Sequence, residues 1–377
     1  MYVCERGDFV AKALSFFKKN AVLVIAVIAA VVTMFFVPPD MEYLEYFDLR
    51  TISCLFCTLA VVCAFKNIWF FRIVAGSIVR VFKTTRTAVL ALVYITLFGS
   101  MLIANDMALI TFLPLGYFVL DSTDNRKLIA FTFIMQNIAA NLGGMLTPFG
   151  NPQNLYLYSF FNIENGEFFS IMFIPFVLSL TLITLCCMFI KSEEMVVHRY
   201  TNTPLDWKRV AVYSVLFALS IAIVFRAVHF AIGTLIIVVS LLFLDRRALK
   251  SVDYGLLLTF CAFFIFSGNM SRIPAVSDLV GNIVAQSPLL CGIVSCQLIS
   301  NVPSAILLSR FTENYAALLV AVNIGGIGTL ISSLASLITF KEYSKCEKGK
   351  TGRYLLLFSA LNFGLLIILG TVAYFMV

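Results

Sequence analysis

Residues 141–151 of the chain read NLGGMLTPFGN, and they interrupt an apolar run in which a helix would otherwise continue. Adjacent glycines and a proline are poor helix formers, and the polar side chains among them are unsuited to hydrocarbon. Residues 323–333 read NIGGIGTLISS and repeat the pattern N-x-G-G-x-x-T. The two stretches predict a pair of broken helices at related positions of a duplicated chain.

The composition is that of a membrane protein. Hydrophobic residues make up 61% of the 377 residues and charged residues 12%, whereas about 25% of residues are charged in soluble domains. Apolar segments long enough to span a bilayer recur along the whole chain, which predicts one polytopic transmembrane domain over residues 1–377 with the lipid bilayer as its solvent. The net charge of +7 comes from basic residues in short loops beside apolar segments, which favours membrane topology over nucleic-acid binding.

The predicted fold is an all-α polytopic membrane protein that contains two kinds of apolar segment. Two segments, 87–120 and 287–310, carry a polar break in mid-run, AND at 104–106 and SNVPS at 300–304. We expect them to be re-entrant hairpins, which enter and leave the membrane by the same face. The remaining apolar segments predict about nine full spans, near residues 20–37, 49–65, 127–161, 168–190, 208–226, 229–245, 254–270, 314–340 and 353–376.

The loop charges indicate an orientation. With the N-terminus in the cytoplasm, the basic residues of 66–86, 246–250 and 341–353 fall inside, and the acidic loops 38–48 and 162–167 fall outside. This bias is the one that the positive-inside rule demands, and a full crossing at either hairpin would destroy it. We therefore expect a multi-pass protein of the plasma or inner membrane with a cytoplasmic N-terminus and an external C-terminus.

The hairpins and broken helices belong to an internal duplication. Residues 47–71 and 252–273 share a pattern, and each is followed by an amphipathic stretch, a hairpin with asparagine at its tip, and the motif N-x-G-G-x-x-T. Since the two units begin five crossings apart, one is inverted relative to the other, as in many secondary transporters. Repeat one is predicted over about 20–190 and repeat two over about 229–377, with 208–226 as a linking span.

The breaks predict a polar cavity near the midplane, because irregular backbone is tolerated at membrane depth only where protein or a polar cavity covers it. The glycines let the backbone turn and expose carbonyl oxygens, which suit an alkali cation. Pro152 can begin a new half-helix with Asn151 capping it, and the positive end of that half-helix favours an anion. The candidate glycines of a coupling-ion site are Gly143, Gly144, Gly325, Gly326 and Gly328.

An anion in this cavity would have to be held without basic side chains, because no lysine or arginine lies inside an apolar run. Asn105 and Asn301, at the hairpin tips, are the strongest candidates for the substrate and for the coupling ion. For any one hydroxyl, a hydrogen bond back to its own helix explains the residue equally well. The full set of substrate candidates is Asn105, Asn141, Thr147, Asn151, Asn154, Ser300, Asn301, Ser304, Asn323, Thr329, Ser332 and Ser333.

Asp106 is the only one of the 20 acidic residues that is set within an apolar run. A charged aspartate at the centre of a bilayer costs about 2.5–3.5 kcal/mol, and either protonation or pairing with a cation removes that cost. We expect Asp106 to bind the coupling ion, sodium or a proton; the alternative is a carboxylate that caps the second arm of its hairpin. No other cofactor or metal is expected, because most of the ten cysteines lie in apolar spans with no histidine nearby.

Four stretches carry a resemblance to a known superfamily, LIANDMALITFLPL at 102–115, NLGGMLTPFGNPQNLYLY at 141–158, ISNVPSAILLS at 299–309 and NIGGIGTLISSLASL at 323–337. They resemble the ion transporter superfamily of the arsenite pumps, its sodium/proton antiporters, the citrate-transporter-like permeases and the divalent anion/sodium symporters. The closest similarity is to the anion permeases of the citrate-transporter-like family. The resemblance implies an elevator mechanism, in which hairpins and broken helices move as one body against a scaffold that forms a homodimer.

The resemblance also indicates which functions to expect. In the symporters each hairpin tip bears Ser-Asn-Thr and forms a sodium site with its broken helix, whereas here the tips read AND at 104–106 and SNV at 300–302. The predicted function is secondary active transport of a small carboxylate or inorganic anion, coupled to sodium or protons. Arsenite or metalloid efflux, sodium–proton exchange and an ion channel are the alternatives. An enzyme is not expected, since no motif such as H-E-x-x-H occurs and Asp106 lacks a partner acid.

Overall fold

The computed structural model describes residues 21–79, 81–195 and 205–376. Within these ranges the chain folds into helices joined by turns, and the strand-like pairing is limited to an isolated bridge between Thr84 and Glu194. The all-α fold predicted from the sequence is therefore confirmed. The N-terminal segment 1–20, which the predicted orientation places in the cytoplasm, lies outside the described residues.

One group of helices comprises the beginnings of the two predicted repeats and the span that links them: α2 (Ala21–Met34), the 3-10 helix η1 (Met41–Tyr46), α3 (Leu49–Asn67), the linking helix α10 (Trp207–Val224), α11 (Phe230–Leu244), α12 (Arg246–Lys250) and α13 (Tyr254–Arg272). Asp48 accepts the N–H of Thr51 at 3.0 Å and so caps α3. Asp253 caps α13 in the same way, through the N–H of Leu256 at 3.0 Å. Matching caps begin matching helices, because a carboxylate there satisfies a free backbone donor.

Two helical hairpins turn at the predicted polar breaks. The first hairpin consists of α5 (Thr85–Ile103) and α6 (Asn105–Ser122), and the short helix α4 (Phe70–Val79) precedes it. The second hairpin consists of α15 (Pro288–Ile299) and α16 (Asn301–Leu308), and the short helix α14 (Pro274–Gln286) precedes it. The axis turns by 117° between α14 and α15. The short helix before the second hairpin is therefore a separate element, as its amphipathic pattern predicts.

The two predicted broken helices are present. Their pieces are η2 (Arg126–Leu128), α7 (Ile129–Gly143), η3 (Gly144–Leu146), α8 (Pro152–Phe160), α17 (Tyr315–Ile324) and α18 (Leu334–Cys346). Turns and bends replace the helix at 147–151 and at 325–333. A long helix follows each broken one, α9 (Asn165–Met188) and α19 (Thr351–Tyr374).

Helix lengths refine the predicted number of spans. Among the described residues, seven helices are long and apolar enough to cross a membrane, or eight when α14 and α15 count together. Each of the nine predicted segments contains a helix, but α2, α11 and α17 have only 14, 15 and 10 residues. The short lengths have local causes: α17 is one half of a broken span, and α11 fills its predicted segment 229–245, itself short, to within one residue at each end.

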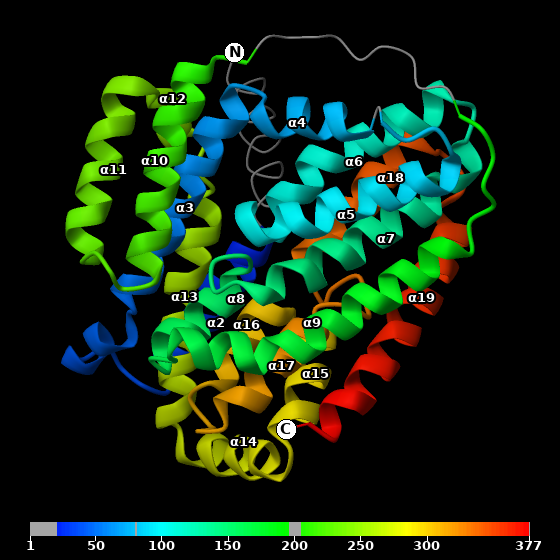
Figure 1. Ribbon diagram of the computed structural model, residues 1–377. Coiled ribbons are helices and arrows are strands. Elements are labelled where there is room, and N and C mark those ends of the chain that lie inside the picture. Colours follow the sequence, from blue (N-terminus) through cyan, green and yellow to red (C-terminus); the bar gives the residue numbers. More distant parts are fainter. Residues whose placement is uncertain (1–20, 80, 196–204, 377) are drawn as a thin grey trace, which may run out of the picture.

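The two repeats interlock around the breaks (Figure 1). α6 packs against α18, and α16 packs against α8, so each hairpin contacts the second half of the other repeat's broken helix. Outside this region α2 packs on α13, while α3 packs on α10 and α11. The segment Arg126–Leu146 is 83% buried, whereas the corresponding share of α19 is 28%. The first broken helix therefore forms the centre of the bundle, and α19 belongs to its outer surface.

Candidate functional site

Both hairpin tips have the same unusual backbone. Ala104 has φ 57° and ψ 148°, and Ser300 has φ 76° and ψ 158°. Residues other than glycine avoid these values, and such strain clusters at functional sites. Asn105 and Asn301 follow, and the Oδ1 of each accepts the backbone N–H of the next residue at 2.9 Å. This local bond occupies the amide oxygen and leaves the Nδ2 group for other partners.

A threonine fastens each break to the hairpin of its own repeat. Thr147 Oγ1 donates to the carbonyl of Met101 at 2.8 Å, and Thr329 Oγ1 donates to the carbonyl of Gln297 at 3.1 Å. Both acceptors lie three residues before the tip of their hairpin. The predicted duplication is therefore visible in individual hydrogen bonds.

Buried amides join the first hairpin to both broken helices. Asn105 Nδ2 donates to Asn141 Oδ1 at 3.3 Å. Asn151 Nδ2 donates to Asn141 O and to Asn323 Oδ1, both at 3.2 Å, and Asn323 Nδ2 donates to Asn154 Oδ1 at 2.5 Å. These five side chains, which we call the amide network, are at most 4% exposed. Amides are stable in such surroundings only when hydrogen-bonded.

Asn301 brings the second hairpin to the same place and leaves a donor free. Its Nδ2 is buried and has no hydrogen-bond partner among the residues that the structure describes. A methyl group built on Gly326 would lie 3.1 Å from that Nδ2 and 3.4 Å from Asn141 Oδ1, so glycine lets these groups approach. Asn151 Oδ1 and Gln153 Oε1 are also buried without a partner. Each unpaired group costs about 1–3 kcal/mol, a cost that a polar ligand removes.

The remaining predicted hydroxyls are engaged by the protein itself. Ser332 Oγ donates to Gly326 O at 2.9 Å, within the second break. Ser333 caps α18, and Ser304 Oγ donates to Ser300 O at 2.7 Å. These hydroxyls hold the backbone of the hairpin and of the break in place.

One predicted role is wrong, because Asn151 does not cap α8. It occupies the N-cap position with extended backbone, and Pro152 begins the helix as predicted, but its side chain accepts no backbone N–H there. The reason is that its amide group is drawn into the network, where it donates to Asn141 and Asn323. The N-terminal end of α8, which carries a partial positive charge, therefore has no side-chain cap.

Two arginines approach the opposite end of α8. Arg226 Nη2 donates to Tyr158 O at 2.9 Å. The guanidinium of Arg310 lies 5.0 Å from the centre of the Phe160 ring. Cations are favourable at the C-terminal end of a helix, so these residues stabilise α8 with its positive end at the network.

Asp106 lies in the first turn of α6, directly after Asn105. Its Oδ1 is buried and has no hydrogen-bond partner within the described ranges 21–79, 81–195 and 205–376. Its side chain makes no capping bond, and Ala104 occupies the N-cap position, so the alternative role as a cap is not observed. The equivalent residue of the second tip is Val302. Only the first hairpin carries an acid at its tip.

Two buried or partly buried amides that hold the breaks were not predicted from the sequence. Asn137 Nδ2 donates to Ser336 Oγ at 3.2 Å and links α7 to α18. Gln297 Nε2 donates to Gly325 O at 2.9 Å and links the second hairpin to its break. The signal was available, because an amide within an apolar run, as in QNIAAN and CQLISN, is costly without a partner.

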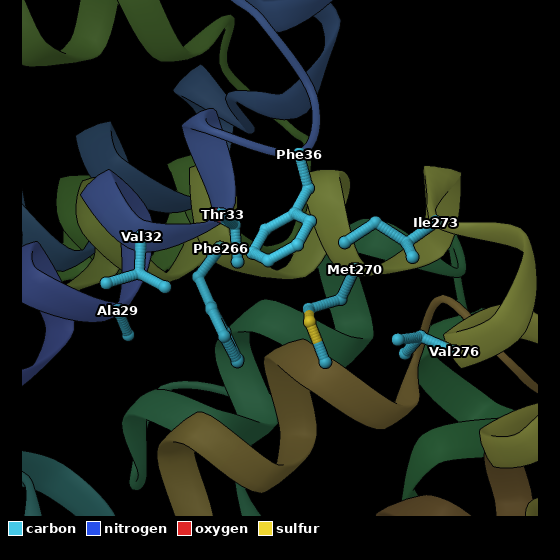
Figure 2. Close-up of a pocket in the computed structure, with 8 residues that line it drawn as sticks. All are labelled: Ala29, Val32, Thr33, Phe36, Phe266, Met270, Ile273 and Val276. Atoms are coloured by element: carbon cyan, nitrogen blue, oxygen red, sulfur yellow. The ribbon is translucent and has the colours of Figure 1, made fainter.

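A pocket of about 400 Å³ opens elsewhere, between α2 and the corner of α13 and α14 (Figure 2). Its lining is apolar apart from Thr33, whose hydroxyl donates to Ala30 O at 2.7 Å. Such a lining suits hydrocarbon rather than an anion. The lining residues, none of them a predicted site residue, are Ala29, Val32, Thr33, Phe36, Phe266, Met270, Ile273 and Val276.

Unpaired amides at paired breaks, deep in a bundle of apolar helices, define the class of protein as a membrane transporter. The profile of the CitMHS family, described as citrate transporter, matches residues 13–320. The chain belongs to this family, as the resemblance of its motifs predicted. It is a multi-pass membrane transporter of the citrate permease type and not an enzyme.

Two curated proteins are similar over most of the chain. "Uncharacterized transporter MJ0456" of Methanocaldococcus jannaschii is 32% identical over 326 residues, which cover 84% of this chain and 87% of that protein. "Inner membrane protein YbiR" of Escherichia coli is 34% identical over 282 residues, which cover 72% and 74%. The crystal structure of the YdaH transporter of Alcanivorax borkumensis, described as having an unusual topology, matches with a TM-score of 0.55 and 16% identity over 89% of this chain and 88% of that one. This last similarity concerns the fold alone.

Proposed function

We propose that this chain is a secondary active carrier of a small anion, carboxylate or inorganic, coupled to sodium ions or protons. The observation that carries the proposal is the free Nδ2 donor of Asn301 beside the amide network, where two hairpin tips and two helix breaks meet. An oxyanion accepts hydrogen bonds from amide groups and from the free N–H groups of a helix N-terminus such as that of α8. A cation or proton that binds at Asp106 neutralises this carboxylate and so removes its repulsion of the anion.

A second candidate, efflux of arsenite or another metalloid, is favoured by the neutral acceptors of the site. Asn151 Oδ1 and Gln153 Oε1 are buried without partners. A fully ionised anion offers them no hydrogen, whereas the hydroxyl groups of an uncharged oxyacid donate to such oxygens. The two candidates therefore differ in which unpaired atoms the solute satisfies.

We propose an elevator motion for this carrier. The bonds of Thr147 and Thr329 tie each break to its hairpin, and the amide network ties the first hairpin to both broken helices. These parts form one body that moves against α2, α3 and α10 to α13. The apolar face of α11, with Ile232, Leu235 and Phe243 exposed, is the scaffold surface that we propose for the homodimer contact.

A ligand screen tests the function. Purified protein is heated with citrate, succinate, sulfate, phosphate or arsenite, each in sodium and in choline buffer. A ligand at about 100 times its Kd that binds only the folded state adds about 2.7 kcal/mol of stability. We expect one anion to raise the melting temperature and to enter proteoliposomes only when an ion gradient is imposed. Stabilisation by arsenite alone would favour the second candidate, and no uptake under any gradient would contradict the proposal.

The Asp106→Asn variant tests the coupling. We expect gradient-driven uptake to be lost while the ligand still raises the melting temperature, because the amide keeps the shape of the carboxylate and loses its charge. The matched control is Asp124→Asn, at an exposed position with φ 58° that asparagine tolerates. Undiminished gradient-driven uptake by Asp106→Asn would remove this residue from the coupling site.

A further inference from the structure

Gln297 occupies a defined position in the duplication. It lies three residues before Ser300, at the place that Met101 takes before Ala104. The two positions are equivalent in space as well as in sequence, because the carbonyl of each accepts the hydroxyl of the threonine in its own break. The chain therefore presents two versions of one contact, one with a methionine side chain and one with a glutamine.

The glutamine side chain enters the second break. Its Nε2 lies 2.9 Å from Gly325 O, 3.2 Å from Ile327 O and 3.3 Å from Ile293 O. Its Oε1 accepts the backbone N–H of Thr329 at 2.8 Å. Three carbonyl oxygens from the hairpin and the break thus converge on one nitrogen atom.

Converging carbonyl oxygens are the ligands that a hard cation prefers. The neutral amide offers its two N–H donors to these three oxygens without bringing a charge. We propose that Gln297 is a built-in substitute for a coupling cation, so that the contact between the second hairpin and its break binds none. The inference rests on the proposed function, since it limits where a coupling cation can bind.

The backbone of the second break is shaped around this amide. Gly328 has φ +128°, a conformation that residues with a side chain rarely adopt, and a Cβ atom there would lie 2.2 Å from Gln297 Oε1. Glycine therefore meets two needs at one position, the conformation of the turn and room for the amide. Leu146 stands at the equivalent position of the first break, where neither need arises.

The first half is built differently. Asn154 Nδ2 bonds three carbonyls of the first break at 3.2–3.3 Å, but Asn154 belongs to α8 and so closes the break from within the same broken helix. The hairpin side of this contact has Met101, which carries no amide. Asp106, with its unpaired Oδ1, lies on the same hairpin. An amide thus takes the carbonyls of both breaks, and the group that remains for a cation is the carboxylate of Asp106 in the first half.

The Gln297→Glu variant tests the proposal, because it keeps the shape and replaces Nε2 with oxygen. An oxygen that faces three carbonyls is unfavourable unless a cation or a proton intervenes. We expect Q297E to melt below the wild type in choline at pH 8 and to regain stability with sodium. In equilibrium binding with radioactive sodium, we expect it to bind one more ion per chain than the wild type.

Two control variants isolate this effect. Gln286→Glu adds a carboxylate at an exposed position at the end of α14, and its melting temperature should respond to sodium as the wild type does. Gln297→Met copies the first hairpin, and it should melt lower than the wild type by the same amount in sodium and in choline. A loss of packing alone would make Q297E behave like Q297M.

The proposal is overturned if Q297E melts alike in sodium and choline and binds no additional sodium. It is also overturned if the wild type binds two sodium ions per chain. If Q297E does not fold in any salt, the number of sodium ions that the wild type binds decides the question. A count of none or one ion per chain supports the proposal. The sodium count needs no transport, so a wild type that carries no solute would contradict the proposed function and leave this inference standing.

Discussion

The two helix breaks share one backbone arrangement with their hairpins, which we call the frame, and differ in the side chains around it. Each hairpin tip has a positive-φ residue followed by asparagine, and each break donates a threonine hydroxyl to its hairpin. Around this common frame, the first half has Met101 and Asp106 where the second has Gln297 and Val302. The matched parts set the backbone geometry, and the unmatched parts carry the chemistry that distinguishes the two halves.

In the proposed carrier, this difference would let a duplicated fold hold an unsymmetrical solute and a coupling ion. Backbone breaks inside a membrane must be satisfied in both repeats, since every unpaired polar group there costs several kcal/mol. The frame is therefore kept twice. Charge is needed only once, so one tip keeps an acid while the amide of Gln297 satisfies the carbonyls of the other half.

The largest expected effect comes from the tip asparagines. We expect Asn105→Ala and Asn301→Ala each to abolish uptake in proteoliposomes while the protein still folds and inserts. A hydrogen bond to a charged group is worth about 1.5–3 kcal/mol, or roughly ten- to one-hundredfold in affinity. Normal uptake by both variants would remove our site assignment.

Stability separates these two variants. Asn105 Nδ2 donates a hydrogen bond to Asn141, whereas Asn301 Nδ2 has no partner in the described part of the chain. We therefore expect Asn105→Ala to lower the stability by about 1 kcal/mol more than Asn301→Ala does. Asn282→Ala, on the exposed side of α14, is the control and should change neither uptake nor melting. Equal destabilisation at both tips would mean that Asn301 is paired in the same way as Asn105.

An intermediate effect is expected at Gly328. Gly328→Ala places a side chain at φ +128° and against Gln297, which should cost about 1–3 kcal/mol. The control is Gly364→Ala in α19, where an added Cβ meets nothing within 4 Å and alanine favours the helix by up to about 1 kcal/mol. Thermal melting in detergent measures both. If Gly328→Ala melted like the wild type, the second break would not be shaped by Gln297.

The smallest expected effect tests the shared frame. Thr147→Val and Thr329→Val each remove one hydroxyl that donates to a hairpin carbonyl, and each should cost about 0.5–1.5 kcal/mol. Thr329 should show the larger loss, because its Oγ1 also accepts the N–H of Ser332 at 3.1 Å. Melting curves of the two variants, compared in one buffer, decide this. A loss confined to one threonine would show that the frame is not shared.

The elements of the fold could be predicted because their signals are local. Apolar runs, the glycine pairs and Pro152 mark helices and breaks, and a polar Asn within a run marks each hairpin tip. The lengths were harder to predict, as α17 shows, because the break after Ile324 ends this helix inside the predicted span 314–340. The predicted amides proved to lie together, whereas the predicted cap at Asn151 did not form.

The sequence by itself determined that the chain is a duplicated, all-helical membrane protein with paired breaks, since each of these properties follows from residues close together along the chain. Only the tertiary structure decided which side chains meet across the breaks. The contact of α6 with α18 and of α16 with α8 joins distant segments, and so does the bond from Asn151 to Asn323. The physical reason is that a helix satisfies its own backbone locally, whereas a buried amide takes whichever partner the packing of other helices brings to it.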